Sequence, residues 1–199
     1  SYSPISILDN LGYGTNATVN SWISISLDSP GTLNTISTIS DWLSGGDFDN
    51  NGYFYGVPYS ASTLLKITPT TGFVTNVGTV SGVDNGYIIT SMAFEPNTQT
   101  MYLGATSGGD SKLYTINLSS GVATFVGNIG AQALITLAIN NAGSMYGIDI
   151  ATDNLIKIDR LTGTTTTIGS IGYDLQYAQD ADFDPANDSL YLFGYATEG

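Results

Sequence analysis

The chain has 199 residues, enough for one domain with a sizeable core, and it contains no cysteine and no histidine. It therefore cannot form disulfide bonds, thiolate metal sites, or catalytic and zinc sites that depend on histidine. The chain has four basic and seventeen acidic residues, a net charge of −13. This charge disfavours nucleic acids and anionic membranes as partners. No apolar run is long enough to enter a membrane.

Residues 1–21 resemble no other part of the chain closely, and we expect them to form an N-terminal extension or an extra strand ahead of a domain over 22–199. The first recognisable element is "WISISLDSPGTLNTIS", Trp22 to Ser37, in which apolar and polar residues alternate on both sides of a turn containing Gly31. This pattern predicts a β-hairpin. It recurs at Leu64–Gly78, Leu113–Gly127 and Leu155–Gly169, with glycine in the place of Ser37.

A second kind of hairpin lies between these copies. In each, an apolar residue precedes a turn rich in Pro, Asn, Asp and Gly, and a tyrosine stands shortly before a closing glycine. The four copies are Asp47–Gly56, Ala93–Gly104, Ala138–Gly147 and Asp182–Gly194. The apolar residues are Phe48, Phe94, Ile139 and Phe183, and the tyrosines are Tyr55, Tyr102, Tyr146 and Tyr191.

The two hairpins together repeat about every 45 residues, so each period holds four short strands, which is typical of a β-propeller blade. We predict an all-β propeller of about four blades with four antiparallel strands each. Because the chain begins with an outer hairpin and ends with an inner one, the last blade is expected to combine the N- and C-terminal hairpins. A fragment of a larger five- to seven-bladed propeller is the alternative, and a β-sandwich is disfavoured because it would not repeat its sequence.

The segment "LYTINLSSGVATFVG" and its sister copies resemble the repeats of secreted bacterial β-propellers, of the YVTN-type and quinoprotein-like families and their uncharacterised extracellular relatives. The resemblance covers about residues 22–194 and rests on hairpins and glycines. It implies a propeller fold and an extracellular or cell-surface location. The cofactor-binding residues of the quinoprotein enzymes have no counterpart here, so we expect no cofactor and no catalytic residues.

The loops that lead into each inner hairpin place aromatic rings beside carboxylate and amide groups. Such loops meet at one face of a propeller and carry function on a rigid scaffold. Rings that cover the C–H face of a sugar, with polar groups for its hydroxyls, suit a glycan; the same residues suit a protein partner. The candidate ligand-binding residues are Asp41, Trp42, Asp84, Asn85, Tyr87, Gln132, Tyr173, Asp174, Gln176 and Tyr177.

Two acidic segments are candidates for metal binding. "DFDNNG", Asp47 to Gly52, matches the first half of an EF-hand loop, but Pro58 stands where a bidentate glutamate is required, so an ordinary hairpin turn is expected. In "DADFD", Asp180, Asp182 and Asp184 alternate along one strand face near the central channel, close to Asp47. Hydrated carboxylates, or a cation such as Ca²⁺ at Asp180 and Asp182, explain them equally well.

We therefore predict a non-catalytic extracellular recognition or adhesion module that binds glycan or protein through its aromatic-lined loop face. The alternative is a subunit of an extracellular filament or surface layer, in which the hairpin Ala181–Gly194 of one copy completes Trp22–Ser37 of the next. A carboxylate-dependent enzyme acting on glycans is a less favoured reading.

Overall fold

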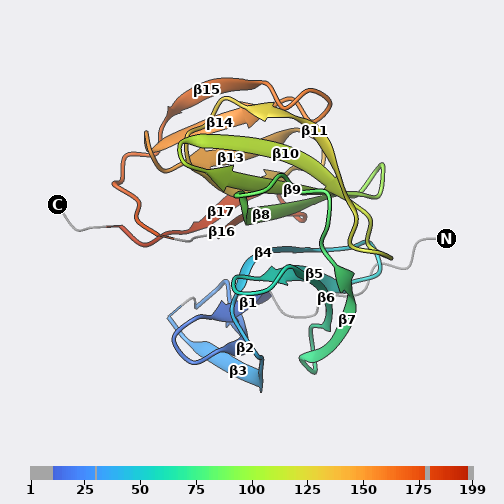
Figure 1. The fold of residues 1–199 in the computed structure, drawn as a ribbon. Helices are drawn as coiled ribbons and strands as arrows, with labels where there is room; N and C mark the ends of the chain where they lie inside the picture. Colours follow the sequence, from blue (N-terminus) through green and yellow to red (C-terminus); the bar gives the residue numbers. More distant parts are fainter. Residues whose placement is uncertain (1–10, 30, 178–179, 197–199) are drawn as a thin grey trace.

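The computed structural model describes residues 11–29, 31–177 and 180–196, and within these residues every regular element is a β-strand (Figure 1). The described part of the chain contains no helix that is long and apolar enough to cross a membrane. The strands are β1 (Leu11–Asn16), β2 (Ser21–Ser26), β3 (Leu33–Thr38), β4 (Leu43–Phe48), β5 (Phe54–Pro58), β6 (Thr63–Thr68), β7 (Phe73–Thr79), β8 (Ile88–Glu95), β9 (Thr100–Ser107), β10 (Asp110–Ile116), β11 (Ala123–Ile129), β12 (Leu134–Ile139), β13 (Met145–Asp149), β14 (Asn154–Ile158), β15 (Thr165–Ser170), β16 (Asp180–Asp184) and β17 (Ser189–Phe193).

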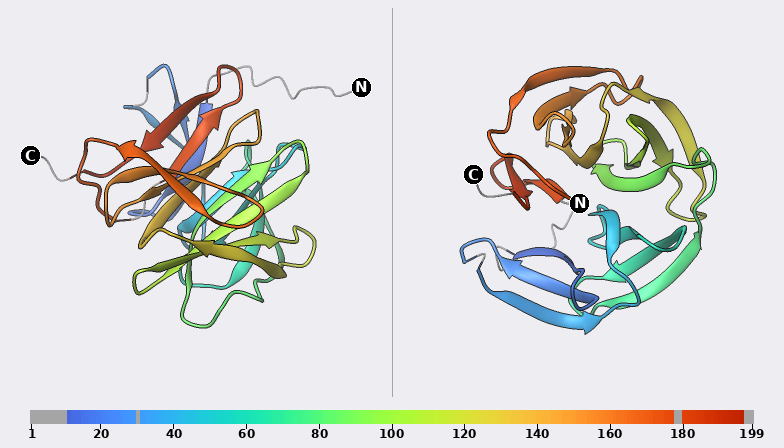
Figure 2. Two further views of the ribbon diagram at one scale, coloured as in Figure 1. Left: turned by 90° about the horizontal axis from the view of Figure 1, so that it is seen from above. Right: turned by 60° about the vertical axis from the view of Figure 1, so that its left-hand side comes forward.

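The strands form antiparallel sheets arranged around an axis, which confirms the predicted β-propeller (Figure 2). Three sheets are complete four-stranded blades: blade 1 (β4–β7), blade 2 (β8–β11) and blade 3 (β12–β15). The N-terminal sheet holds β1, β2 and β3, and the C-terminal hairpin holds β16 and β17. The innermost strands β4, β8, β12 and β16 pack on one another in this order around the axis.

The inner hairpins repeat in structure as the sequence predicts. Phe48, Phe94, Ile139 and Phe183 stand opposite Phe54, Met101, Met145 and Leu190, at the same place in the four hairpins. The four predicted tyrosines stand one residue further along, opposite Asp47, Ala93, Ala138 and Asp182. Tyr55 and Tyr102 are buried in the cores that join successive blades.

The outer hairpins share a β-bulge that confirms Trp22–Ser37 as a fourth copy. The register shifts directly after Trp22, Leu64, Leu113 and Leu155, which pair with Ser37, Gly78, Gly127 and Gly169. A glycine is needed at two of these places because the turn of the following blade packs against the backbone there. A Cβ at Gly78 would lie 2.6 Å from the Ser120 carbonyl oxygen, and one at Gly127 would lie 1.8 Å from that of Thr162.

The N-terminal and C-terminal hairpins do not join into one sheet among the described residues, which corrects the predicted shared blade. Strand β2 pairs with β3 on one side and with β1 on the other, so its inner edge is already occupied. Tyr13 of β1 stands opposite Ser24, just as Tyr55 stands opposite Lys66 in blade 1. The N-terminal sheet therefore has a second strand of its own, and no described strand joins it to the C-terminal hairpin (Figure 2).

Residues 1–21 thus contain a further copy of the repeat. The stretch "LDNLGYG", Leu8 to Gly14, corresponds in sequence to "FDNNGYFYG", Phe48 to Gly56, with two residues fewer before the tyrosine. This shorter spacing hides the match from a comparison that assumes a fixed spacing. Of this segment the structure describes residues 11–21, where β1 takes the place of an inner-hairpin strand.

Candidate functional site

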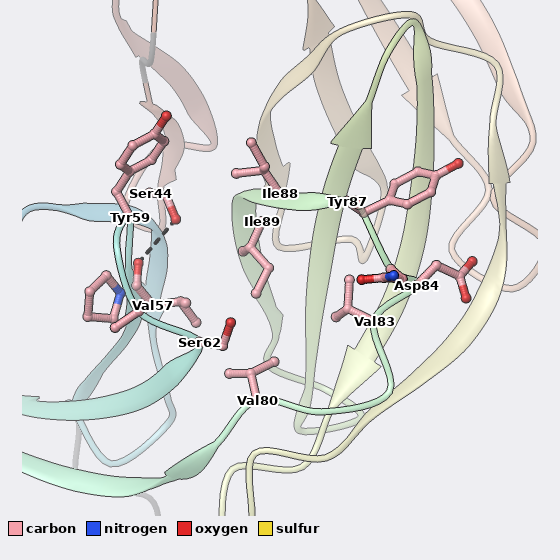
Figure 3. Close-up of a pocket in the computed structure, with 14 residues that line it drawn as sticks. Ser44, Val57, Tyr59, Ser62, Val80, Val83, Asp84, Tyr87, Ile88 and Ile89 are labelled. Atoms are coloured by element: carbon pink, nitrogen blue, oxygen red, sulfur yellow. Dashed lines mark hydrogen bonds between the residues drawn. The ribbon is translucent and has the colours of Figure 1, made fainter.

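A cleft of about 260 Å³ lies between blades 1 and 2, on the face where the loops enter the inner strands (Figure 3). One side is the end of β5 and the loop from β5 to β6, with Val57, Tyr59 and Ser62. The other side is the connection from β7 to β8, with Asp84 and Tyr87. Val57, Val80 and Ile89 lie at its base but are almost fully buried, so polar groups make up most of the accessible lining.

Backbone hydrogen bonds hold the connection from β7 to β8 in place. The Val80 amide donates to the Ser62 carbonyl oxygen at 2.9 Å, and the Ala123 amide donates to Ser81 at 2.7 Å. Gly82 has a φ of +86° and lies so close to blade 2 that a Cβ would come within 2.2 Å of the Ala123 carbonyl oxygen. Only glycine fits where the connection from β7 to β8 passes this close to blade 2. This close contact fixes the position of the second wall of the cleft.

Asp41, Trp42 and Tyr59 build the first wall. The rings of Trp42 and Tyr59 stack with their centroids 4.6 Å apart and their planes 16° apart. Asp41 accepts hydrogen bonds from the backbone amides of Ser60 at 2.8 Å and Trp42 at 2.9 Å, which ties the two loops together. Burial raises the pKa of Asp41, but the hydrogen bonds from Ser60 and Trp42 outweigh it and lower the pKa, so the carboxylate is ionised at neutral pH.

Asp84 and Tyr87 build the second wall, around Lys112 of β10. The Lys112 Nζ lies 2.5 Å from an Asp84 carboxylate oxygen and 4.4 Å from the centre of the Tyr87 ring. The Tyr87 hydroxyl donates to Asp110, and this hydrogen bond raises the pKa of Tyr87. The hydrogen bond from Lys112 lowers the pKa of Asp84 and raises that of Lys112. Fixed charges thus hold the Tyr87 ring at the rim of the cleft.

The cleft presents the Tyr59 ring on one wall, with hydroxyl, amide and carboxylate groups along its edges. Tyr59 remains 54% exposed although it stacks on Trp42, so its other face is available to a ligand. Figure 3 shows that the Tyr87 side chain, on the other wall, points away from the cleft, where its ring lies beside Lys112. Asp84 and Asn85 add oxygen and nitrogen atoms to the same lining. Such a site can hold a flat, partly apolar ligand that also carries hydroxyl groups.

The predicted site residues separate into two groups. Asp84, Asn85 and Tyr87 line the cleft, and Asp41 and Trp42 support its wall. The other five do not line it: Gln132, Tyr173, Asp174, Gln176 and Tyr177 lie in the loops that lead into β12 and β16. There, Tyr173 and Tyr177 are exposed, and the Tyr177 ring centre lies 5.7 Å from that of Tyr195. Gln176 donates to Asp174 at 2.9 Å, and the Gln132 amide donates to Asp149 at 3.2 Å.

Two residues were absent from the sequence prediction: Tyr59, which lines the cleft, and Lys112, which contacts Asp84 and Tyr87 from β10. Tyr59 belongs to the segment "VPYSAS" between the two hairpins of blade 1, a loop that reaches the same face as the entry loops. Its position directly after the end of the second strand of the blade could have assigned Tyr59 to this face from the sequence. Lys112 lies within β10, and nothing in its sequence context distinguishes it from the lysines of other outer strands.

A separate group of carboxylates faces the central channel. Asp47 and Asp182 occupy equivalent places in blade 1 and the C-terminal hairpin, where blades 2 and 3 carry Ala93 and Ala138. Asp47 accepts hydrogen bonds from the amides of Phe48 and Phe94, both at 2.6 Å, and so connects blades 1 and 2.

The channel carboxyl groups hold their protons more tightly than ordinary carboxyl groups. Burial, and then the negative charge of Asp182, raise the pKa of Asp180 to about 8 and raise that of Asp47 well above its usual range. Burial raises the pKa of Asp182 to about 6. Asp180 and Asp182 remain exposed to solvent at the inner side of the ring, although protein surrounds their carboxyl groups. The remaining water reduces the free-energy cost of ionising these groups but does not remove it.

In the two acidic segments, Asp184 and Asp49 accept hydrogen bonds within hairpin turns. Asp184 does not share the channel with Asp180 and Asp182; its carboxylate accepts hydrogen bonds from Ala186 at 2.8 Å and Asn187 at 2.6 Å in the turn that ends β16. Asp49 likewise accepts bonds from the amides of Asn51 and Tyr53 in a hairpin turn. Throughout 11–29, 31–177 and 180–196, no three carboxylates lie close enough together to hold a metal ion.

Solved structures similar to this chain are β-propellers of several kinds. Virginiamycin B lyase from Staphylococcus aureus has a TM-score of 0.56 at 11% identity, over 90% of this chain and 58% of the lyase. A chain of a nidogen/laminin complex has a TM-score of 0.66 at 13% identity, over 94% of this chain and 68% of its own length. A gluconolactonase from Xanthomonas campestris has a TM-score of 0.57 at 11% identity, over 94% of this chain and 80% of its own. These identities establish a shared fold and no shared activity.

The chain spans little more than half the length of the lyase. No protein with a curated description matches its sequence. A family model described as a repeat of unknown function, DUF6923, matches residues 48–194, from the first apolar residue of blade 1 to the end of the C-terminal hairpin. The protein belongs to the DUF6923 family of repeats.

Proposed function

We propose that the protein is a non-catalytic recognition module that binds carbohydrate in the cleft between blades 1 and 2. The observation that carries the proposal is the Tyr59 ring, which stacks on Trp42 and keeps one face exposed at the edge of the cleft, with Asp84 and Asn85 in the lining. A tyrosine ring covers the C–H face of a sugar, while carboxylate and amide groups accept or donate hydrogen bonds to its hydroxyls.

The rigidity of the cleft supports binding rather than a moving active site. The Trp42 stack, the Asp41 hydrogen bonds and the Lys112–Asp84 ion pair hold both walls before any ligand arrives. A pre-organised site loses little conformational entropy on binding. The large negative charge suits a protein working outside the cell or at its surface, and we place the module there.

A glycan array tests the proposal, followed by calorimetric titration of the best ligand. We expect Tyr59→Ala to weaken binding about tenfold or more, because it removes one ring face of the cleft. Tyr173→Ala is the matched control: this tyrosine is 68% exposed on the same face but lies outside the cleft, so affinity should not change. The proposal fails if no glycan binds, or if the Tyr59 variant binds as the unchanged protein does. Binding of a protein instead of a glycan also contradicts it.

A second function, carboxylate-dependent catalysis, is favoured by one observation. The pKa of Asp180 is raised to about 8 and that of Asp182 to about 6, so at neutral pH one carboxyl group is protonated beside another that is ionised. Such a pair can divide the roles of acid and base. Hydrolysis of lactones or polysaccharides that Asp182→Asn abolishes would support this function. Absence of turnover on a broad panel of both substrate classes rules it out.

A further inference from the structure

The sequence contains two Asn-Gly pairs, and one of them lies in the candidate cleft. Asn85–Gly86 belongs to the connection from β7 to β8, and Asn51–Gly52 belongs to the hairpin turn between β4 and β5. Asparagine is a chemically labile residue, and a following glycine favours its conversion to an acid, because glycine has no Cβ to obstruct attack by its own backbone nitrogen. The two pairs share this local chemistry, so their surroundings decide which of them reacts.

Hydrogen bonds to Asp49 hold the Asn51–Gly52 pair. The Asn51 side-chain nitrogen donates to one Asp49 carboxylate oxygen at 3.1 Å, and the Asn51 backbone amide donates to the other at 2.9 Å. The Gly52 amide, which would have to attack, donates to the Asp49 carbonyl oxygen at 3.0 Å. These bonds must break before Asn51 can react, so the turn protects this residue.

The Asn85–Gly86 pair lacks such bonds. Among the residues that the structure describes, none forms a hydrogen bond with the Asn85 side chain or with the Gly86 amide. Both residues are exposed, and a Cβ at Gly86 would meet nothing within 4 Å. The φ angles of Gly86 and Gly52 are +84° and +76°, so the glycine backbone does not distinguish the two pairs. What distinguishes them is the freedom of the reacting groups.

We propose that Asn85 is a site of spontaneous deamidation, at which the cleft changes chemically as the protein ages. The Gly86 nitrogen attacks the side-chain carbonyl carbon of Asn85 and forms a carbon–nitrogen bond. The side-chain amino group leaves as ammonia, which carries away the proton of the Gly86 amide. Water then adds to either carbonyl group of the resulting succinimide ring and opens it, which gives aspartate or isoaspartate. Nothing is oxidised or reduced, and water is the co-reactant.

Deamidation changes the charge and the shape of the second wall of the cleft. Asn85 lines the cleft together with Asp84, so the new carboxylate adds negative charge to a chain whose net charge is already −13. The N–H donors of the amide are lost. Isoaspartate also carries the side-chain methylene in the backbone and so displaces the loop. On the basis of the proposed function, the aged protein should bind carbohydrate more weakly than the fresh protein.

Mass spectrometry can compare both asparagines in one sample. The folded protein is incubated in mildly alkaline buffer prepared with isotopically labelled water, so that each newly formed acid carries the heavy oxygen. Trypsin cleavage after Lys66 and Lys112 then places the two Asn-Gly pairs in separate peptides. We expect Asn85 to react about tenfold faster than Asn51 or more, because the Asn51 turn must open first.

Two comparisons show whether the hydrogen bonds cause the difference. Asp49→Ala removes the carboxylate that holds Asn51 and should raise the rate at Asn51 about threefold or more, while Asn85 in the same molecule keeps its rate. In the urea-unfolded chain the two rates should converge. Equal rates in the folded protein overturn the proposal. A difference that persists in urea, or an Asp49 variant in which Asn51 reacts no faster, overturns it too.

The effect on the cleft is measured separately, by calorimetric titration with the best ligand from the glycan array. Asn85→Asp, which reproduces one product, should bind about threefold more weakly or worse. Asn85→Gln, compared with the same variant before incubation, should lose no affinity, because glutamine forms the corresponding ring far more slowly. An Asn85→Asp variant with unchanged affinity overturns the effect on the cleft. If the unchanged protein binds no glycan, the proposed function fails, and the conversion rates alone decide the deamidation site.

Discussion

At the scale of single residues, Glu95 shows how a charge is accommodated between blades 2 and 3. It is inaccessible to solvent, so its carboxylate loses its hydration on folding. Its carboxylate accepts hydrogen bonds from the amides of Asn97 at 3.1 Å and Thr98 at 2.7 Å and lies 3.1 Å from Arg160 of the next blade. Burial raises the pKa of Glu95, but these hydrogen bonds outweigh it and lower the pKa to about 2.

The substitution Glu95→Gln should therefore destabilise the protein by about 1–3 kcal/mol at pH 7, because it removes a charge-assisted network from a buried place. The folded pKa lies below the ordinary value of 4.5, so this contribution is present above about pH 5 and is lost as the pH falls towards 2. Urea unfolding at pH 7 and pH 3 checks it. The difference between the two proteins should shrink at pH 3, and an equal difference at both pH values contradicts the role of the charge.

Gly127 and Gly169 form a matched pair at the same repeat position. Gly127→Ala should cost at least about 2 kcal/mol, because the new Cβ would lie 1.8 Å from the Thr162 carbonyl oxygen. Gly169→Ala should change stability by no more than about 0.5 kcal/mol, since nothing lies within 4 Å there. Urea unfolding of both variants measures the contrast. Equal effects would show that the two positions are not packed differently.

At the scale of elements, hairpins were predictable where periodicity and glycine spacing coincide. The four inner and four outer hairpins follow from the alternation and from landmarks such as Phe48 and Gly78. Strand β1 was missed because its tyrosine, Tyr13, follows the preceding apolar residue at a shorter sequence spacing than in the other copies, and spacing alone does not reveal strand register. For the site, Trp42 and Tyr87 could be assigned to the loop face. The stacking of Trp42 on Tyr59 depends on how two loops meet in space, which no local pattern determines.

The N-terminal sheet depends on Trp22 for its attachment to blade 1. Trp22 is completely buried, its ring lies 4.9 Å from that of Phe54, and its Nε1 donates to the Pro69 carbonyl oxygen at 2.9 Å. Trp22→Ala should cost about 3–5 kcal/mol. Because neighbouring blades contribute stability locally, hydrogen exchange should accelerate in β1–β3 and remain slow in β12–β15. Uniform acceleration of exchange through all sheets would contradict this local coupling. Phe73→Ala, at an exposed position of the outer strand β7, is the control and should leave the exchange rates unchanged.

At the scale of the whole molecule, the channel carboxylates make the ring sensitive to pH. Folded-state pKa values of about 8 for Asp180 and about 6 for Asp182 lie above the ordinary value of 3.8. A raised folded pKa contributes stability that is complete below the unfolded pKa and is lost as the pH rises through the folded pKa. The net charge of −13 acts in the same direction, since self-repulsion grows as carboxyl groups ionise.

We therefore expect the melting temperature to fall between about pH 5 and pH 8. Asp182→Asn should reduce this fall and raise the melting temperature at pH 8, because it removes one negative charge beside Asp180 and Asp47. Asp159→Asn, in an exposed outer turn, is the control and should leave the slope unchanged. A melting temperature that does not depend on pH, or an Asp182 variant with an unchanged slope, contradicts the coupling across the channel.

A crystal structure with the best ligand from the glycan array tests whether the cleft between blades 1 and 2 binds carbohydrate. We expect a sugar ring in this cleft, with its C–H face on Tyr59 and a hydroxyl group within hydrogen-bond distance of Asp84 or Asn85. A ligand bound at the Tyr173–Tyr177 loops or in the central channel, with the cleft left empty, would contradict it.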